Sequence, residues 1–109
     1  MAKRRIEKTV MDAARKYVDE VQKHFNVDAM FLFGSFAKGT QHDGSDIDIA
    51  VVSPDIKNTF YDDLELMRLR RKIDVRIEPH SIHSDDFRKK ENPFINEVIN
   101  TGIRLYGAT

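Results

Sequence analysis

The sequence predicts a small mixed α/β (α+β) domain in which a mixed β-sheet is flanked by helices. Three features predict this class. Some segments repeat hydrophobic residues at helical spacing, short apolar runs typical of strands lie between them, and glycine, proline and serine mark the turns. With 109 residues, the chain is expected to form a single domain over 1–109 around one modest core.

The first half of the chain predicts an amphipathic helix followed by two strands. Its first segment interleaves hydrophobic and charged residues with helical periodicity, and its apolar runs are bounded by glycine, serine or proline. The expected elements are a helix over 6–25, a buried strand over 27–33 ending at Gly34, a short helical turn over 35–38 closed by Gly39, a polar loop over 40–45, and a strand over 46–52.

The second half predicts two more helices and two more strands. Cap residues, acidic residues in a first turn and a proline that opens a helix mark the helical segments. The expected elements are a helix capped by Asn58 or Thr59 and running to about Arg71, a strand over 73–78 in which Ile73, Val75 and Ile77 alternate with polar residues before Pro79, a helix opened by Asn92 and Pro93 and closed by Gly102, and a short strand over 103–106.

Composition limits the classes of function. Lys plus Arg and Asp plus Glu both number 18, so bulk charge gives no reason to expect nucleic-acid binding. The absence of cysteine excludes disulfides, thiolate metal sites and cysteine nucleophiles. No apolar run approaches the ~20 residues that span a bilayer, and no signal-peptide apolar segment follows the basic start. We therefore expect a cytoplasmic protein that contacts neither membranes nor nucleic acid.

Two carboxylates form the centre of the most informative segment. Gly34-Ser35 is followed after ten residues by Asp46-x-Asp48. Because side chains alternate along a strand, Asp46 and Asp48 project from one face while the hydrophobic residues between and after them face the core. Paired carboxylates repel each other, and a divalent cation would remove the conflict, since such oxygens are the usual ligands of Mg²⁺. The alternative is a solvated strand edge.

Asp74 adds a third carboxylate on the third predicted strand. If the second and third predicted strands pair, Asp74 lies beside Asp46 and Asp48. Three carboxylates could then hold two metal ions that clamp the attacking and leaving oxygens of a nucleotidyl transfer. The alternative is an edge charge paired with Arg71 or Arg76.

Gly34 and Ser35 predict a phosphate-binding turn. A glycine after a strand lets the backbone turn sharply and approach a phosphate closely. If residues from Ser35 onward begin a helical turn, their amide groups face the anion, and the Ser35 hydroxyl can donate to a phosphate oxygen. The alternative for a Gly-Ser pair is an ordinary turn.

Three further residues are candidate nucleotide ligands, each with an alternative. Lys38 either contacts a phosphate or is a solvated loop lysine. Ser45 either steadies its loop or contacts the nucleotide directly. Arg76 shares the predicted face of Asp74 and either reaches the triphosphate or neutralises the carboxylates. The four histidines have no metal-ligand spacing and are assigned no role.

The pattern Gly34-Ser35-x10-Asp46-x-Asp48 with the later Asp74 resembles the DNA-polymerase-beta-like nucleotidyltransferase superfamily, and the short chain resembles its minimal nucleotidyltransferase (MNT) branch. The resemblance covers residues 27–78. It implies the polymerase-beta-like fold, ATP as substrate, and two Mg²⁺ ions, or Mn²⁺, as cofactors. It also implies that the three aspartates are catalytic metal ligands.

Free-standing MNT proteins resemble the antitoxin half of HEPN–MNT toxin–antitoxin pairs. This implies a protein adenylyltransferase that moves AMP from ATP onto a tyrosine of a partner HEPN toxin, releasing pyrophosphate, within a homo- or hetero-oligomer. Two alternatives stay open: a non-catalytic module that masks its partner by contact, and a small-molecule nucleotidyltransferase of the aminoglycoside type. The acceptor, the base of the nucleotide and the oligomeric state are not determined by the sequence.

Overall fold

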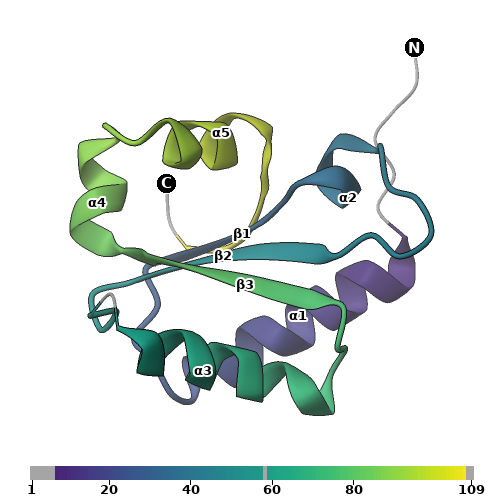
Figure 1. Cartoon of the computed structure of the whole chain (residues 1–109), viewed down its shortest axis with the longest axis horizontal. Helices are drawn as coiled ribbons and strands as arrows, with labels where there is room; N and C mark the ends of the chain where they lie inside the picture. Colours follow the sequence, from purple (N-terminus) through teal and green to yellow (C-terminus); the bar gives the residue numbers. More distant parts are fainter. Residues whose placement is uncertain (1–6, 58, 108–109) are drawn as a thin grey trace.

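The computed structural model describes residues 7–57 and 59–107, and in these residues a four-stranded sheet carries helices on both faces (Figure 1). None of the helices in these residues combines the length and the hydrophobicity that a membrane-spanning helix needs. The elements are, in order, α1 (Lys8–Gln22), β1 (Ala29–Phe33), α2 (Ser35–Lys38), β2 (Ile47–Ser53), α3 (Phe60–Leu69), the 3-10 turn η1 (Arg70–Lys72), β3 (Ile77–His83), α4 (Ser84–Lys89), α5 (Pro93–Thr101) and β4 (Ile103–Tyr106).

The sheet is mixed, with strand order β3-β2-β1-β4. β1 runs antiparallel to both β2 and β4, whereas β2 and β3 run parallel. Parallel neighbours need a crossover connection, and α3 is part of that connection between β2 and β3. The central position of β1 explains its continuous apolar run, because all five of its residues are buried.

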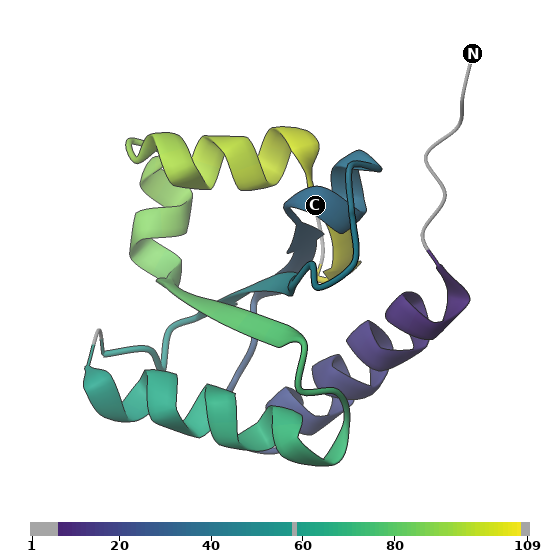
Figure 2. The ribbon, with the colours of Figure 1, turned by 45° about the vertical axis from the view of Figure 1, so that its right-hand side comes forward.

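Two hydrophobic cores lie on opposite faces of the sheet. α1 and α3 cover one face, and α4 and α5 cover the other (Figures 1 and 2). Along β2, Ile47 and Ile49 belong to the first core, and Ala50 and Val52 belong to the second. The same alternation places Asp48 on the face of α4 and α5.

Most predicted elements are confirmed. Thr59 forms a capping box with Asp62 at the start of α3. Asn92 accepts a hydrogen bond from the backbone of Phe94 at the start of α5, and Gly102 ends that helix. Ile6, the first residue of the predicted first helix, and the alternative cap Asn58 lie outside the described residues.

The predicted third strand over 73–78 is wrong. Ile73 and Asp74 both donate backbone hydrogen bonds to Arg70, and Ile77 donates one to Asp74, so this segment is a turn. The Asp74 carboxylate also accepts from the backbone amide of Arg76 at 2.9 Å, which is the side-chain interaction that stabilises such turns. Val75, one of the apolar residues of the predicted alternation, is 69% exposed.

The strand instead begins at Ile77 and passes through Pro79, where it was expected to stop. β3 is an edge strand, and proline is tolerated there when its nitrogen faces away from the neighbouring strand. The Ile77 carbonyl accepts from the Arg70 guanidinium at 2.9 Å, so this side of β3 faces away from β2. Pro79 has the same orientation and removes no hydrogen bond between the strands. The helix α4, which follows directly, was not predicted.

A buried hydrogen bond joins α1 to α3. The Tyr17 hydroxyl, on a fully buried side chain, donates to the Leu66 carbonyl at 2.6 Å. Burial raises the pKa of Tyr17 well above its usual range, although the charge of Arg70 opposes the shift. Tyr17 is therefore held in its neutral, donating form.

We expect Tyr17→Phe to lower the free energy of unfolding by about 1 kcal/mol, because one buried hydrogen bond is lost. The raised pKa adds a pH dependence. This stabilisation is present below the unfolded-state pKa of about 10 and is lost as the pH rises above it. Urea unfolding at pH 8 and pH 11 measures both effects. Tyr106→Phe, at a partly exposed position, is the control and should change neither; equal stability of both variants at pH 8 would contradict the prediction.

Candidate active site

The predicted phosphate turn and Asp48 meet at one end of β1 and β2. Phe33 pairs with Asp48 across the two strands, which brings the next residue, Gly34, beside the aspartate. Gly34 has φ 77° and ψ −153°, a conformation open essentially to glycine alone. A β-carbon at Gly34 would overlap Asp48 Oδ2 and lie 3.2 Å from Asp48 Cγ. Glycine is thus required both by the turn and by the neighbouring carboxylate.

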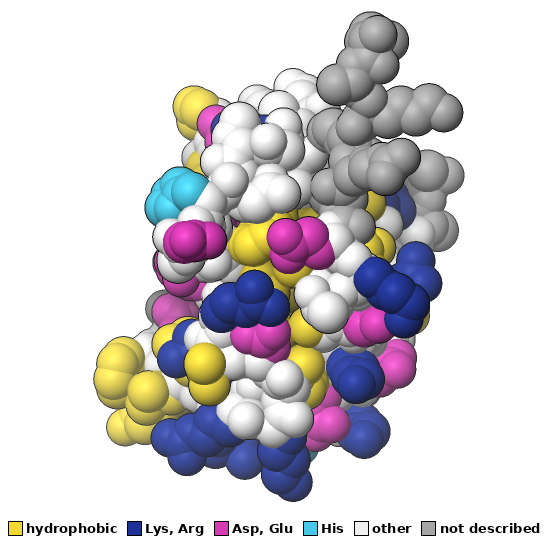
Figure 3. Space-filling view, turned by 90° about the vertical axis from the view of Figure 1, so that its right-hand side faces the viewer, with side chains coloured by type: hydrophobic (Ala, Val, Ile, Leu, Met, Phe, Trp, Pro, Cys, Tyr) yellow, Lys and Arg dark blue, Asp and Glu magenta, His cyan; other side chains and the backbone are white. Residues whose placement is uncertain are grey.

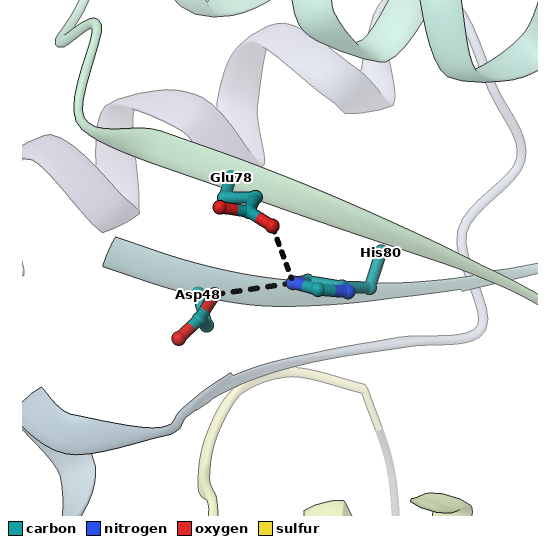
Figure 4. A group of neighbouring side chains, drawn as sticks. All are labelled: Asp48, Glu78 and His80. Atoms are coloured by element: carbon teal, nitrogen blue, oxygen red, sulfur yellow. Dashed lines mark hydrogen bonds and ion pairs between the residues drawn. The ribbon is translucent and has the colours of Figure 1, made fainter. Parts of the chain in front are cut away.

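The parallel pairing of β2 with β3 brings a second group of side chains to the same place. The register aligns Asp48 with Glu78 and Ala50 with His80. Asp48, Glu78 and His80 each present one ligand-type atom, and these atoms lie within 4.8 Å of one another. Figure 4 shows the His80 ring reaching toward both carboxylates, with Nε2 at 3.1 Å from Asp48 Oδ1 and 3.8 Å from Glu78 Oε1.

Asp46 extends the carboxylate cluster. It directly precedes β2 and is exposed. The pKa of Glu78 is raised above its usual range, first by a hydrogen bond to the Asp46 carboxylate, then by burial and by the negative charge of Asp46. A raised carboxyl pKa indicates that these groups conflict when all are ionised. The cluster of Asp46, Asp48 and Glu78 therefore suits a cation.

Asp74 does not join this cluster, so its predicted place beside Asp46 and Asp48 is wrong. Its two carboxylate oxygens accept from the Arg76 side chain at 3.1 and 2.9 Å. That hydrogen bond, with a further one from the Arg76 backbone, lowers the pKa of Asp74 although burial opposes the shift. The structure therefore shows the alternative predicted for Asp74, an ion pair with Arg76. Because β3 begins after this turn, Glu78 takes the position expected for Asp74.

A signal for Glu78 and His80 was present in the sequence but was not used. The two residues are separated by one position, as Asp46 and Asp48 are, so a strand through Pro79 puts both on one face. Ending the strand before Pro79 removed them from consideration, and the lack of metal-ligand spacing left His80 without a role.

Lys38 and Ser45 have structural partners. The Lys38 ammonium lies 3.5 Å from the Glu97 carboxylate and links the end of α2 to α5. Ser45 is buried, and its hydroxyl accepts from the backbone amide of His42 at 2.9 Å. Ser45 thus steadies its loop, which is one of the two roles predicted for it. Direct contact of either residue with a nucleotide stays a prediction.

Arg76 lines a cavity of about 330 Å³ beside this loop, together with Phe36 and residues 41–45. Its guanidinium is paired with Asp74, and that pairing raises the pKa of Arg76. Neutralisation of a carboxylate is therefore the observed role of Arg76. Its contact with the triphosphate stays a prediction that its position in the cavity wall allows.

A mixed sheet that sets a glycine turn against clustered carboxylates is the arrangement expected of a nucleotidyltransferase. The family described as polymerase beta, nucleotidyltransferase matches residues 15–109, which include the turn and every carboxylate of the cluster. The chain belongs to this family, as the sequence resemblance implied.

A curated relative is the protein adenylyltransferase MntA of Shewanella oneidensis. It is 32% identical over 78 residues, which are 72% of this chain and 52% of the relative. The chain therefore spans about half the length of the curated relative that it matches.

Solved structures share the fold. A toxin–antitoxin crystal structure with AMP-PNP has a TM-score of 0.67 at 23% identity. The match covers 90% of this chain and 75% of the chain in that structure. The complex of tri-AMPylated Shewanella oneidensis HEPN toxin with MNT antitoxin has a TM-score of 0.60 at 18% identity. The match covers 91% of this chain and 73% of the chain in that complex. The predicted fold class is confirmed.

We expect Gly34→Ala to lower the free energy of unfolding by roughly 2–4 kcal/mol and to abolish ATP binding, because the new methyl group overlaps Asp48 in a strained backbone. Gly39→Ala is the matched control. Gly39 also has positive φ, at 78°, but a β-carbon there meets nothing within 4 Å. It should cost only about 1–2 kcal/mol and leave ATP binding intact. Chemical denaturation and calorimetry measure both, and equal effects at the two glycines would contradict the prediction.

Proposed function

We propose that this chain is a metal-dependent nucleotidyltransferase that transfers AMP from ATP to a tyrosine hydroxyl of a HEPN-type partner toxin, and that it acts in this way as an antitoxin. The observation that carries the proposal is the cluster of Asp46, Asp48 and Glu78 against the Gly34–Ser35 turn. Membership of the nucleotidyltransferase family and likeness to MntA support the choice of reaction. The likeness in fold to an MNT antitoxin in complex with a HEPN toxin supports the choice of partner.

The cluster fits a hard divalent cation. Three carboxylates supply the oxygen ligands that Mg²⁺ prefers, and the raised pKa of Glu78 reflects a conflict that a cation would relieve. We propose that Asp46, Asp48 and Glu78 hold two Mg²⁺ ions, for which Mn²⁺ can substitute. When bound, such ions polarise the α-phosphate and shield the charge of the leaving pyrophosphate.

The chain's own groups divide the remaining work. The Gly34 backbone permits close approach of the triphosphate, and the Ser35 hydroxyl donates to a phosphate oxygen. The acceptor oxygen bonds to the α-phosphorus while the bond from that phosphorus to the bridging oxygen breaks, and pyrophosphate leaves. Glu78 lies beside Asp48 and borders a groove beside β3, so we assign to it the role of accepting the proton of the acceptor hydroxyl.

A groove gives the acceptor a way in. It has a volume of about 500 Å³ and lies beside the edge strand β3. Glu78 and His80 line it together with Met67 of α3, Arg70 of η1 and Phe94 of α5. An acceptor side chain in this groove would lie next to Glu78.

The surface beside this groove favours a protein as acceptor. Hydrophobic side chains of α3 and the following turn stay exposed, among them Tyr61 at 78%, Leu64 at 47% and Val75 at 69%. Figure 3 shows hydrophobic side chains beside Lys and Arg side chains at the lower left of the face it draws. Exposed apolar surface of this kind marks contact with a macromolecule more than with a small solute. We propose that the reaction takes place in the cytoplasm, as expected from the sequence.

The function is tested by incubating the purified chain with ATP labelled at the α-phosphate, Mg²⁺ and a HEPN-type partner. We expect the label on a partner tyrosine. Inhibition of the partner by binding, without label, would instead favour a masking module. Label on an added aminoglycoside but not on the partner would favour a small-molecule nucleotidyltransferase.

Metal should strengthen ATP binding, because clustered carboxylates otherwise repel the triphosphate. Calorimetric titration with ATP in Mg²⁺, in Mn²⁺ and in a chelator measures the difference. Affinities that do not change between these conditions would remove the basis for the metal site.

Glu78→Gln should cut AMP transfer by about a hundredfold or more, the scale typical of lost acid–base or metal-assisted catalysis. The matched control is Asp74→Asn, which also replaces a carboxylate by an amide and should keep transfer within a few-fold of the unaltered chain. Initial rates of label transfer measure both. If Asp74→Asn is the inactive variant and Glu78→Gln the active one, the assignment of the third carboxylate reverts to Asp74.

A further inference from the structure

His80 is held in the cluster by aromatic packing. Its ring lies edge-on to Phe33, with centroids 4.9 Å apart and planes at 67°, and tilted against Phe94 at 5.8 Å. Phe33 and Phe94 also contact each other at 5.4 Å. The three rings come from β3, β1 and α5. Packing between three elements therefore supports the orientation of the imidazole in addition to its contacts with the carboxylates.

The imidazole holds Asp48 from one side while Gly34 bounds it from the other. His80 Nε2 lies 3.1 Å from Asp48 Oδ1, and Asp48 Oδ2 occupies the space that a β-carbon of Gly34 would need. One carboxylate oxygen is thus tied to the histidine, and the second is directed at the phosphate turn. The hydrogen bond to His80 therefore limits the rotation of the Asp48 carboxylate.

We propose that His80 is a positioning residue of the metal site: its Nε2–H orients Asp48 so that Oδ2 faces the cation, and the imidazole itself does not coordinate. This inference rests on the proposed metal site. Hydrogen-bonded partners of this kind set the orientation of metal ligands in many proteins. Nε2 is already engaged by Asp48, and Mg²⁺ selects oxygen over imidazole nitrogen, so orientation is the role that the geometry favours over ligation.

Mn²⁺ binding to the chain without nucleotide tests the role, because it needs neither a partner nor turnover. We expect His80→Leu to weaken Mn²⁺ binding by about tenfold or more, the usual scale for such partners of a metal ligand. His80→Gln places an amide donor near the position of Nε2 and should stay within about threefold of the unaltered chain. The loss of the unbound Mn²⁺ signal in electron paramagnetic resonance measures these affinities.

His83→Ala separates positioning from general stability. His83 lies on the same strand, and its ring accepts from the Asp85 amide as the cap of α4. Its removal should lower the free energy of unfolding without changing Mn²⁺ affinity, whereas His80→Leu should keep its stability and lose affinity. Unchanged Mn²⁺ affinity in His80→Leu would overturn the proposal.

The pulsed resonance spectrum of bound Mn²⁺ distinguishes positioning from ligation. A directly bound imidazole produces a strong nitrogen coupling, and we expect none in the unaltered chain. A coupling that disappears in His80→Leu would show that His80 is a ligand and overturn the proposal. Failure of the unaltered chain to bind Mn²⁺ at all would overturn the metal site itself, and with it the role of His80.

Discussion

The Asp48 carboxylate lies against the α-carbon of Gly34, in space that any other residue would fill with its own side chain. This approach depends on the antiparallel pairing of β1 and β2, which puts Phe33 opposite Asp48. It joins two parts of the site that are separated along the chain, the turn that would receive the phosphates and the carboxylate that would hold the cation. A loss of glycine therefore disturbs both parts together.

The opposite environments of Asp74 and Glu78 explain why one carboxylate belongs to the site and the other to the scaffold. Asp74 accepts from the side chain and the backbone of Arg76, so its charge is already balanced and its pKa is lowered. Glu78 faces Asp46, and its pKa is raised. A balanced carboxylate gains little from a cation, whereas a group of unbalanced ones gains much. The electrostatics and the strand register thus both identify Glu78 as the third carboxylate of the site.

The edge position of β3 serves both the fold and the proposed reaction. Pro79 and the Arg70 guanidinium, which binds the carbonyls of Val75 and Ile77, occupy the outer side of the strand and discourage pairing with another chain. The same side stays open as the groove that reaches Glu78. An edge protected in this way can admit an acceptor side chain without adding a strand to the sheet.

The sequence by itself determined the local part of this protein: helices α1, α3 and α5 with the caps of α3 and α5, the buried strand β1, and the Gly34-Ser35 and Asp46-x-Asp48 pattern with its family. These features depend on periodicity and on neighbours close along the chain, which a sequence displays directly. Only the tertiary structure decided that Glu78 and His80 face Asp48. That placement depends on where a turn closes and on the register between two strands. The alternation of Ile73, Val75 and Ile77 is compatible with a strand, but backbone hydrogen bonds to Arg70 and Asp74 form a turn there instead. Pro79 misled for the same reason, because whether a proline ends a strand depends on which neighbour its nitrogen faces, and that neighbour is distant in sequence.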